Sequence, residues 1–134
     1  MATLAQARVD LAAIKHNVAL LKERVGGAEV MGAVKADAYG HGLVPTSKAV
    51  LEGGASRLGT AYIWEALALR EGGVTAPVLS WIVGPGEPID EALEAGVELS
   101  AADEPLLDEI AAAARRTGRP ARTHLEADTG MSRG

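Results

Sequence analysis

Short apolar runs alternate with amphipathic stretches along the 134-residue chain. A short apolar run bounded by glycine or proline is typical of a buried strand. Apolar residues spaced three and four apart indicate one face of a helix. These patterns predict five strands, at about 29–34, 57–61, 77–83, 97–100 and 121–127. They predict helices at about 10–24, 43–51, 63–70, 89–94 and 103–116.

The first and last of these helices show their boundaries most clearly. Asp10 can cap the first helix, and Gly26 with Gly27 ends it. Ser100 or Asp103 can cap the last one, which has Pro105 in its first turn. The apolar face of the first helix is expected to consist of Leu11, Ile14, Val18, Leu21 and Val25.

The regular alternation of strands and helices predicts right-handed β-α-β units and therefore a parallel sheet. The fold class is α/β, and two architectures fit the pattern. One is an open, doubly wound sheet, and the other is part of an eight-stranded α/β barrel. No GxGxxG sequence follows the first predicted strand, which disfavours a dinucleotide-binding fold.

Composition narrows the function classes. The net charge of -5 disfavours nucleic-acid binding, which needs a basic surface. No apolar stretch is long enough to span a bilayer, and residues 1–9 lack the apolar core of a signal peptide. We therefore expect a cytoplasmic protein. There is no cysteine, and the three histidines show no metal-ligand spacing, so no metal site is expected.

A single lysine, Lys35, follows the first predicted strand, just before a loop that contains Gly40 and Gly42. An ammonium group is costly to bury without a partner, and one reason to place it there is chemistry. Partial burial favours the neutral amine, which can form a Schiff base with an aldehyde such as pyridoxal phosphate. The alternative is a lysine whose head extends into solvent at the strand end.

Two stretches resemble the alanine racemases, which are pyridoxal-phosphate enzymes. The first is AVKADAYGHG at 33–42, which differs from the usual family pattern by having Asp37 in place of asparagine. The second is DTGMSRG at 128–134. The resemblance implies a partial (β/α)8 TIM-type barrel of about five β-α units. Residues 1–134 would then be the N-terminal part of the cofactor-binding barrel domain, without the C-terminal β domain of the family.

The family relationship also implies an activity. Alanine racemases interconvert L- and D-alanine by removing the α-proton, supply D-alanine for peptidoglycan, and act as homodimers. Their second base is a tyrosine of the partner subunit's C-terminal domain, which this chain does not include. The later phosphate-binding loops and the arginine that faces the pyridine nitrogen are also absent. We therefore expect the 134-residue polypeptide alone to be an inefficient racemase.

The resemblance assigns roles to four residues. Lys35 matches the lysine that holds the cofactor and exchanges the α-proton, and Tyr39 matches a hydrogen-bond donor to the cofactor phosphate. Arg133 matches an arginine that approaches the phenolic oxygen of the cofactor and the substrate carboxylate. Trp81 falls near the cofactor ring, with core packing as the alternative. For His41 a structural role is expected rather than catalysis.

Glu126 departs from the family pattern. Most relatives have a lysine here, which in several is carbamylated and so presents a carboxylate to the arginine. Strand alternation places Arg122, His124 and Glu126 on one face. We hypothesise that Glu126 points inward and orients Arg133 directly. The alternative is an exposed glutamate on a strand.

Two other functions remain open at this stage. The first is a pyridoxal-phosphate racemase of the same fold that acts on another amino acid, such as serine. The second is a non-catalytic fragment that binds the cofactor or serves in assembly. The residues that determine the size of the substrate pocket lie largely outside this chain, so the sequence does not separate these possibilities.

Overall fold

The computed structural model describes residues 5–133. Within them, short parallel strands alternate with helices. The strands are β1 (Met31–Ala33), β2 (Arg57–Thr60), β3 (Val78–Ser80), β4 (Glu98–Ala101) and β5 (Thr123–Leu125). The helices are α1 (Leu11–Arg24), α2 (Lys35–Gly40), α3 (Leu43–Glu52), α4 (Ile63–Glu71), α5 (Ile89–Glu94) and α6 (Glu104–Thr117).

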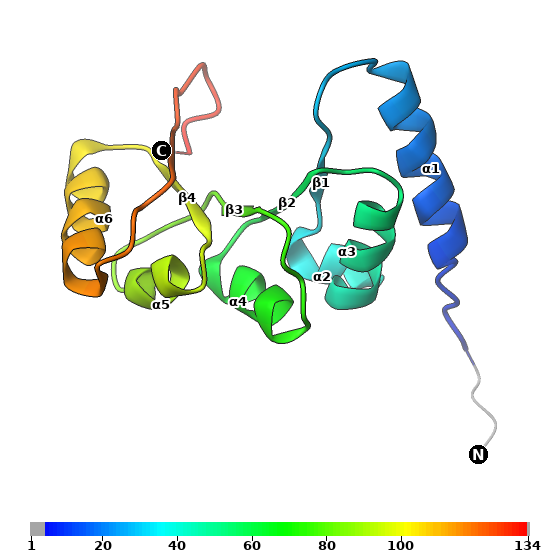
Figure 1. Cartoon of the computed structure of the whole chain (residues 1–134), viewed down its shortest axis with the longest axis horizontal. Coiled ribbons are helices and arrows are strands. Elements are labelled where there is room, and N and C mark those ends of the chain that lie inside the picture. Colours follow the sequence, from blue (N-terminus) through cyan, green and yellow to red (C-terminus); the bar gives the residue numbers. More distant parts are fainter. Residues whose placement is uncertain (1–4, 134) are drawn as a thin grey trace.

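The strands lie in the sheet in the order β1-β2-β3-β4-β5, so each pairs in parallel with the next along the chain. The helices α3 to α6 follow one side of this curved sheet and leave the other side open (Figure 1). In a doubly wound sheet the strand order reverses and helices cover both faces. The observed order therefore rules out the open architecture and identifies a segment of an α/β barrel.

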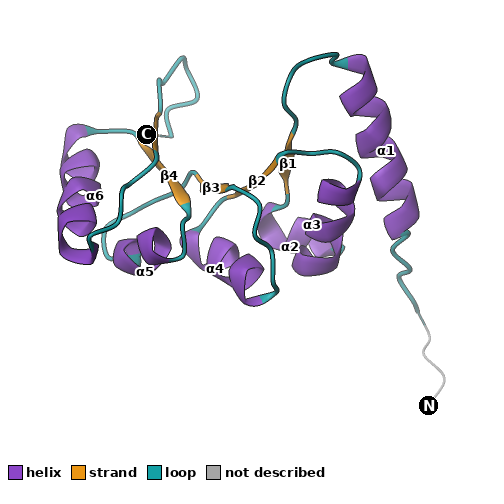
Figure 2. Ribbon diagram, in the orientation of Figure 1, coloured by secondary structure: helices purple, strands orange, loops and turns teal. Residues whose placement is uncertain are grey.

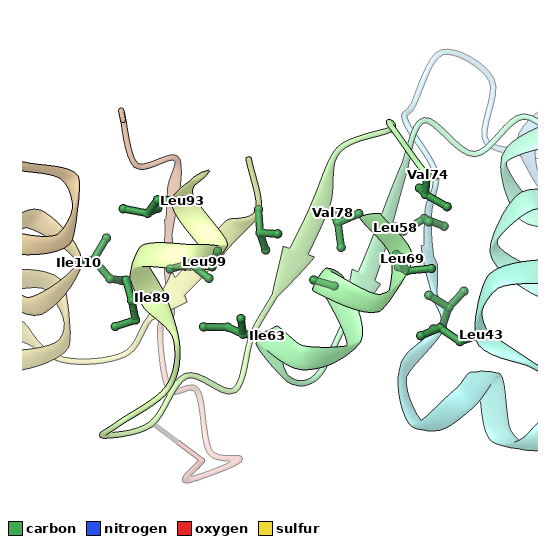
Figure 3. Packing of buried hydrophobic residues seen from close by; sticks show 14 of the residues in the cluster. Leu43, Leu58, Ile63, Leu69, Val74, Val78, Ile89, Leu93, Leu99 and Ile110 are labelled. Carbon is green, nitrogen blue, oxygen red and sulfur yellow. The ribbon is translucent and has the colours of Figure 1, made fainter. Parts of the chain in front are cut away.

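The hydrophobic core lies between the sheet and the helices (Figures 2 and 3). The strands β2, β3 and β4 contribute alternate residues to it, because successive side chains point to opposite faces. Side chains with almost no exposed surface include Leu58, Val78 and Leu99 from the strands and Ile63, Leu69 and Ile110 from the helices. The opposite face of the sheet carries Arg57, Trp81 and Glu98, and it faces the interior of the barrel.

The predicted elements agree with the structure in order and type, with three corrections. Four of the five strands are shorter than predicted, since fewer residues pair with neighbours, and β4 has its predicted length but begins one residue later. The segment Lys35–Gly40, predicted as a loop, forms α2. The apolar face of α1 is only partly covered, because α1 packs beside α3 on the outside: Ile14 and Val18 join the core, but Leu21 is 55% exposed.

Candidate active site

Lys35 begins a left-handed turn at the carboxyl end of β1. The four residues that follow it, Ala36–Tyr39, have φ angles between 51° and 55°. A left-handed conformation costs roughly 1–2 kcal/mol for each residue that has a Cβ atom. The turn therefore depends on contacts with its surroundings.

One of these contacts comes from Asp37. Its Oδ1 accepts a hydrogen bond from the backbone N–H of Leu43 at 2.6 Å, and its carbonyl accepts one from Gly42 at 3.1 Å. Leu43 is the first residue of α3, and the N-cap of that helix, Gly42, offers no side chain. Asp37 thus satisfies an N-terminal N–H of α3 and joins the turn to the helix. An asparagine oxygen can accept the same bond.

The second contact comes from Glu65, which sequence reasoning missed. The residue is 1% exposed, and its carboxylate accepts a hydrogen bond from the backbone N–H of Ala36 at 2.5 Å. The available signal was its position three residues after Tyr62 at the start of α4, which is the spacing of a capping box. That signal predicts a local cap and does not reveal the contact with the Lys35 turn.

The turn brings the Lys35 amine to Tyr39. Nζ donates a hydrogen bond to Oη of Tyr39 at 2.6 Å and lies 4.5 Å from the centre of its ring. The aromatic face attracts the ammonium group, which adds to this contact. Tyr39 itself is 73% exposed. The pair that the motif singles out therefore meets directly.

Arg133 lies beside Glu126, which follows β5 by one residue. Nη2 of Arg133 is 3.2 Å from Oε1 of Glu126, and the two side chains are 41% and 20% exposed. The intervening loop is closed by Asp128, whose Oδ1 accepts the N–H groups of Gly130 and Ser132, both at 2.9 Å. These hydrogen bonds hold the pKa of the Asp128 carboxyl below its usual value, and the bond from Ser132 has the largest effect.

Lys35, Trp81 and Arg133 line one cavity of about 430 Å³ at the carboxyl end of the sheet. Residues from the ends of β1, β2 and β3 form its walls, together with the loop after β5. Glu126 lines a neighbouring hollow of about 300 Å³, which shares Trp81 and Arg133. Tyr39 is not among the lining residues of either.

The position of Trp81 depends on Gly59 of β2. A Cβ atom on Gly59 would lie 2.4 Å from Cζ3 of Trp81, so any larger residue would collide with the indole. Trp81 therefore packs against Gly59 of the sheet and also borders the cavity. From the sequence, Trp81 had two alternative roles, core packing and a place at the site. Its position is compatible with both.

The remaining polar residues make other contacts. Nδ1 of His41 lies 2.8 Å from the carbonyl of Ala38 in its own turn. On the barrel side of the sheet, the buried Glu98 contacts Arg57 at 3.1 Å and His124 at 2.9 Å.

Within residues 5–133, no cluster of three or more acidic or histidine side chains has the arrangement of a metal site. No helix in the same range combines the length and apolar character needed to cross a membrane.

A further hollow of about 350 Å³ lies beside Gly96, Glu98 and Arg122, before β4 and β5 begin. It is therefore at the amino end of the sheet. In α/β barrels the chemistry is at the carboxyl ends of the strands, where Lys35 and Arg133 are found. The geometry thus favours the cavity at the carboxyl end as the site.

Comparison with known proteins identifies the family of this chain. The sequence pattern of the family described as "Alanine racemase, N-terminal domain" matches residues 9–134. The chain belongs to this family. It is 54% identical over 134 residues to an alanine racemase of Thermobifida fusca, covering 100% of this chain and 36% of that protein.

Solved structures of alanine racemases have the same fold over the matched region. The enzyme of Streptomyces coelicolor has a TM-score of 0.90 at 47% identity, covering 94% of this chain and 34% of its own. The enzyme of Streptomyces lavendulae has a TM-score of 0.91 at 44% identity, and the match covers 94% of this chain and 33% of that one. This chain thus spans about a third of the length of these relatives and forms part of their α/β barrel.

Proposed function

We propose that this chain is the N-terminal part of the barrel domain of a cytoplasmic, pyridoxal-phosphate-dependent racemase. The reaction is the interconversion of L- and D-alanine, which supplies D-alanine for peptidoglycan. The observation that carries the proposal is the meeting of Lys35 and Arg133 at one cavity, although they lie far apart in the sequence. Membership of the alanine racemase family supports the choice of substrate.

The side chains at the cavity have the chemistry that pyridoxal phosphate requires. Lys35 provides a primary amine for its aldehyde, and Trp81 provides an aromatic surface beside it. Arg133 is a permanently charged donor suited to an anionic oxygen. Tyr39 does not line the cavity, but its hydroxyl lies 2.6 Å from Lys35 Nζ and is a donor suited to the phosphate. When bound, the cofactor supplies a ring that withdraws electrons from the α-carbon of the amino acid.

The residues of this chain have distinct tasks in the proposed reaction. Lys35 Nζ takes or returns the α-proton on one face of the substrate, as a positioned general base or acid. Arg133 binds the substrate carboxylate, with Glu126 holding its guanidinium at 3.2 Å. The Lys35–Tyr39 hydrogen bond keeps the amine at the end of the left-handed turn.

Racemisation also needs a proton donor on the opposite face of the α-carbon. Among the described residues that line the cavity, Lys35 is the one lysine, and the carboxylate of Glu65 is engaged by three backbone N–H groups. We propose that the complete enzyme, acting as a homodimer, provides this group from outside these 134 residues. The 134-residue polypeptide alone is then an inefficient racemase, and a steady rate comparable with that of complete enzymes would contradict this.

The direct test is to trap the cofactor on the purified chain. The protein is mixed with pyridoxal phosphate, reduced with borohydride, digested and analysed by mass spectrometry. A stoichiometric adduct on Lys35 alone is expected. The variants Lys35→Met and Lys48→Arg are the matched pair, because Lys48 is exposed on α3. The first should abolish the adduct, and the second should leave it unchanged.

Labelling scattered over Lys15, Lys22 and Lys48, or no labelling, would contradict the proposed site. Such a result would mean that the segment shares the ancestry of the racemases without forming a cofactor site by itself.

A further inference from the structure

Glu65 is an ionisable side chain in the core with an unusual set of partners. It is 1% exposed, and within the described residues no arginine or lysine forms an ion pair with it. Its carboxylate instead accepts three backbone N–H groups: Ala36 at 2.5 Å, Ala61 at 2.8 Å and Tyr62 at 3.0 Å. These bonds offset the cost of burying the charge.

The two oxygens have separate tasks. Oε2 accepts Ala61 and Tyr62, which close the end of β2 onto the start of α4. Oε1 accepts Ala36, which follows Lys35 at the end of β1 and is 29 residues away in sequence. The first pair of bonds is a helix cap. The third is not, because it joins the ends of two neighbouring strands.

We propose that Glu65 is a positioning residue for Lys35: its carboxylate fixes the peptide that follows the lysine and so aims the amine into the cavity. Ala36 is the first of the four left-handed residues, so this bond acts where the chain leaves its ordinary conformation. Glu65 and Lys35 line the same cavity. The inference rests on the proposed function only in taking Lys35 as the cofactor-binding amine.

The variant Glu65→Gln separates the two tasks. Glutamine has one oxygen, which can remain on the Ala61 and Tyr62 side and keep the helix cap. Its amide NH₂ then faces the Ala36 N–H, and two donors cannot bond. Glu65→Asp is the second variant, because its carboxylate still caps α4 but is one methylene too short to reach Ala36 as well. Glu71→Gln, on the exposed last residue of the same helix, is the matched control.

Two measurements test the proposal. The first is amide hydrogen exchange, which needs no cofactor: in the wild type the Ala36 amide should be protected although its residue is exposed. In Glu65→Gln it should exchange about tenfold faster or more, the scale of one lost bond to a charged group, while Ala61 and Tyr62 stay protected. The second is the rate of borohydride-trapped labelling of Lys35 by pyridoxal phosphate, measured against pH.

In Glu65→Gln the labelling of Lys35 should slow by about tenfold, which corresponds to about 1.4 kcal/mol, and its pH profile should move. Lys48 should stay unlabelled in the same sample, and Glu71→Gln should match the wild type. A purely structural role would predict normal labelling once the variant is folded.

Three results would overturn the inference: an unprotected Ala36 amide in the wild type, unchanged Ala36 exchange in both folded variants, or normal Lys35 labelling once that amide is released. The first requires no variant, so it applies even if both variants unfold. If the wild type itself is not labelled at Lys35, the proposed function fails, and the Ala36 exchange data still test the link to Glu65.

Discussion

The guanidinium of Arg133 lies 3.2 Å from the carboxylate of Glu126, at the carboxyl end of β5. The two residues meet because the Asp128 turn reverses the chain between them. Glu126 is the less exposed partner, at 20% against 41%. A carboxylate that belongs to the chain itself thus contacts the arginine, so the ion pair forms without chemical modification of a lysine.

This pair leads to the first prediction. In a protein of racemase length that carries this segment, Glu126→Gln should weaken substrate binding by about two- to fivefold, since a partly exposed ion pair contributes up to about 1 kcal/mol. The change should appear mainly in KM for alanine, measured by steady-state kinetics. Glu91→Gln, on the exposed face of α5, is the control. Unchanged KM and kcat in Glu126→Gln would end the hypothesis that this residue orients Arg133.

Asp37 should be replaceable by asparagine but not by alanine. Asparagine keeps an oxygen for the Leu43 N–H and tolerates the positive φ of 55°, so the stability should stay close to that of the wild type. Alanine should lower the free energy of unfolding by about 1 kcal/mol, as for loss of a helix cap. Urea unfolding measures both. Asp10→Ala removes the cap of α1 and gives the reference value. If Asp37→Ala is as stable as Asp37→Asn, the hydrogen bond to Leu43 is unimportant.

Gly59→Ala should displace Trp81. The new Cβ would stand 2.4 Å from the indole, so the ring must shift, at a cost of about 1–3 kcal/mol. The fluorescence of Trp81 should change in a Trp64→Phe background, where it is the remaining tryptophan. Gly84→Ala is the control, because a Cβ at Gly84 meets no atom within 4 Å. Identical spectra for the two variants would be inconsistent with the observed packing.

The Asp128 turn should weaken in acid. Hydrogen bonds from Ser132 and Gly130 lower the pKa of this carboxyl in the folded chain. Its contribution is therefore complete above the ordinary aspartate pKa of about 3.9 and is lost as the pH falls through the lower folded value. The amide signals of Gly130 and Ser132 in NMR spectra should titrate in that lower range. Asp128→Asn should remove the titration, and a midpoint above the ordinary value would contradict the assigned cause.

The regular order of the elements was predictable because it depends on local patterns. Apolar runs and helical spacing located every strand and five of the six described helices, and Asp10 and Asp103 cap as their residue type suggested. The extent of each strand was not predictable. A residue belongs to a strand only if a residue of the adjacent strand forms backbone hydrogen bonds with it. The exposed part of the α1 face was missed for the same reason, since burial depends on what packs against it.

The sequence by itself determined the alternation of strands and helices and the lysine at the end of the first strand, and it named Tyr39, Trp81, Glu126 and Arg133 as candidate site residues. These follow from residue type, spacing and resemblance. The hydrophobic pattern fitted both the open sheet and the barrel segment, and the resemblance favoured the barrel. Tertiary structure confirms the barrel segment through the strand order. It also decided the left-handed turn after Lys35, the cap from Asp37 and the contact from Glu65 to Ala36. The physical reason is that backbone N–H groups carry no sequence signal, so the acceptor that satisfies them is known only once distant segments have packed together.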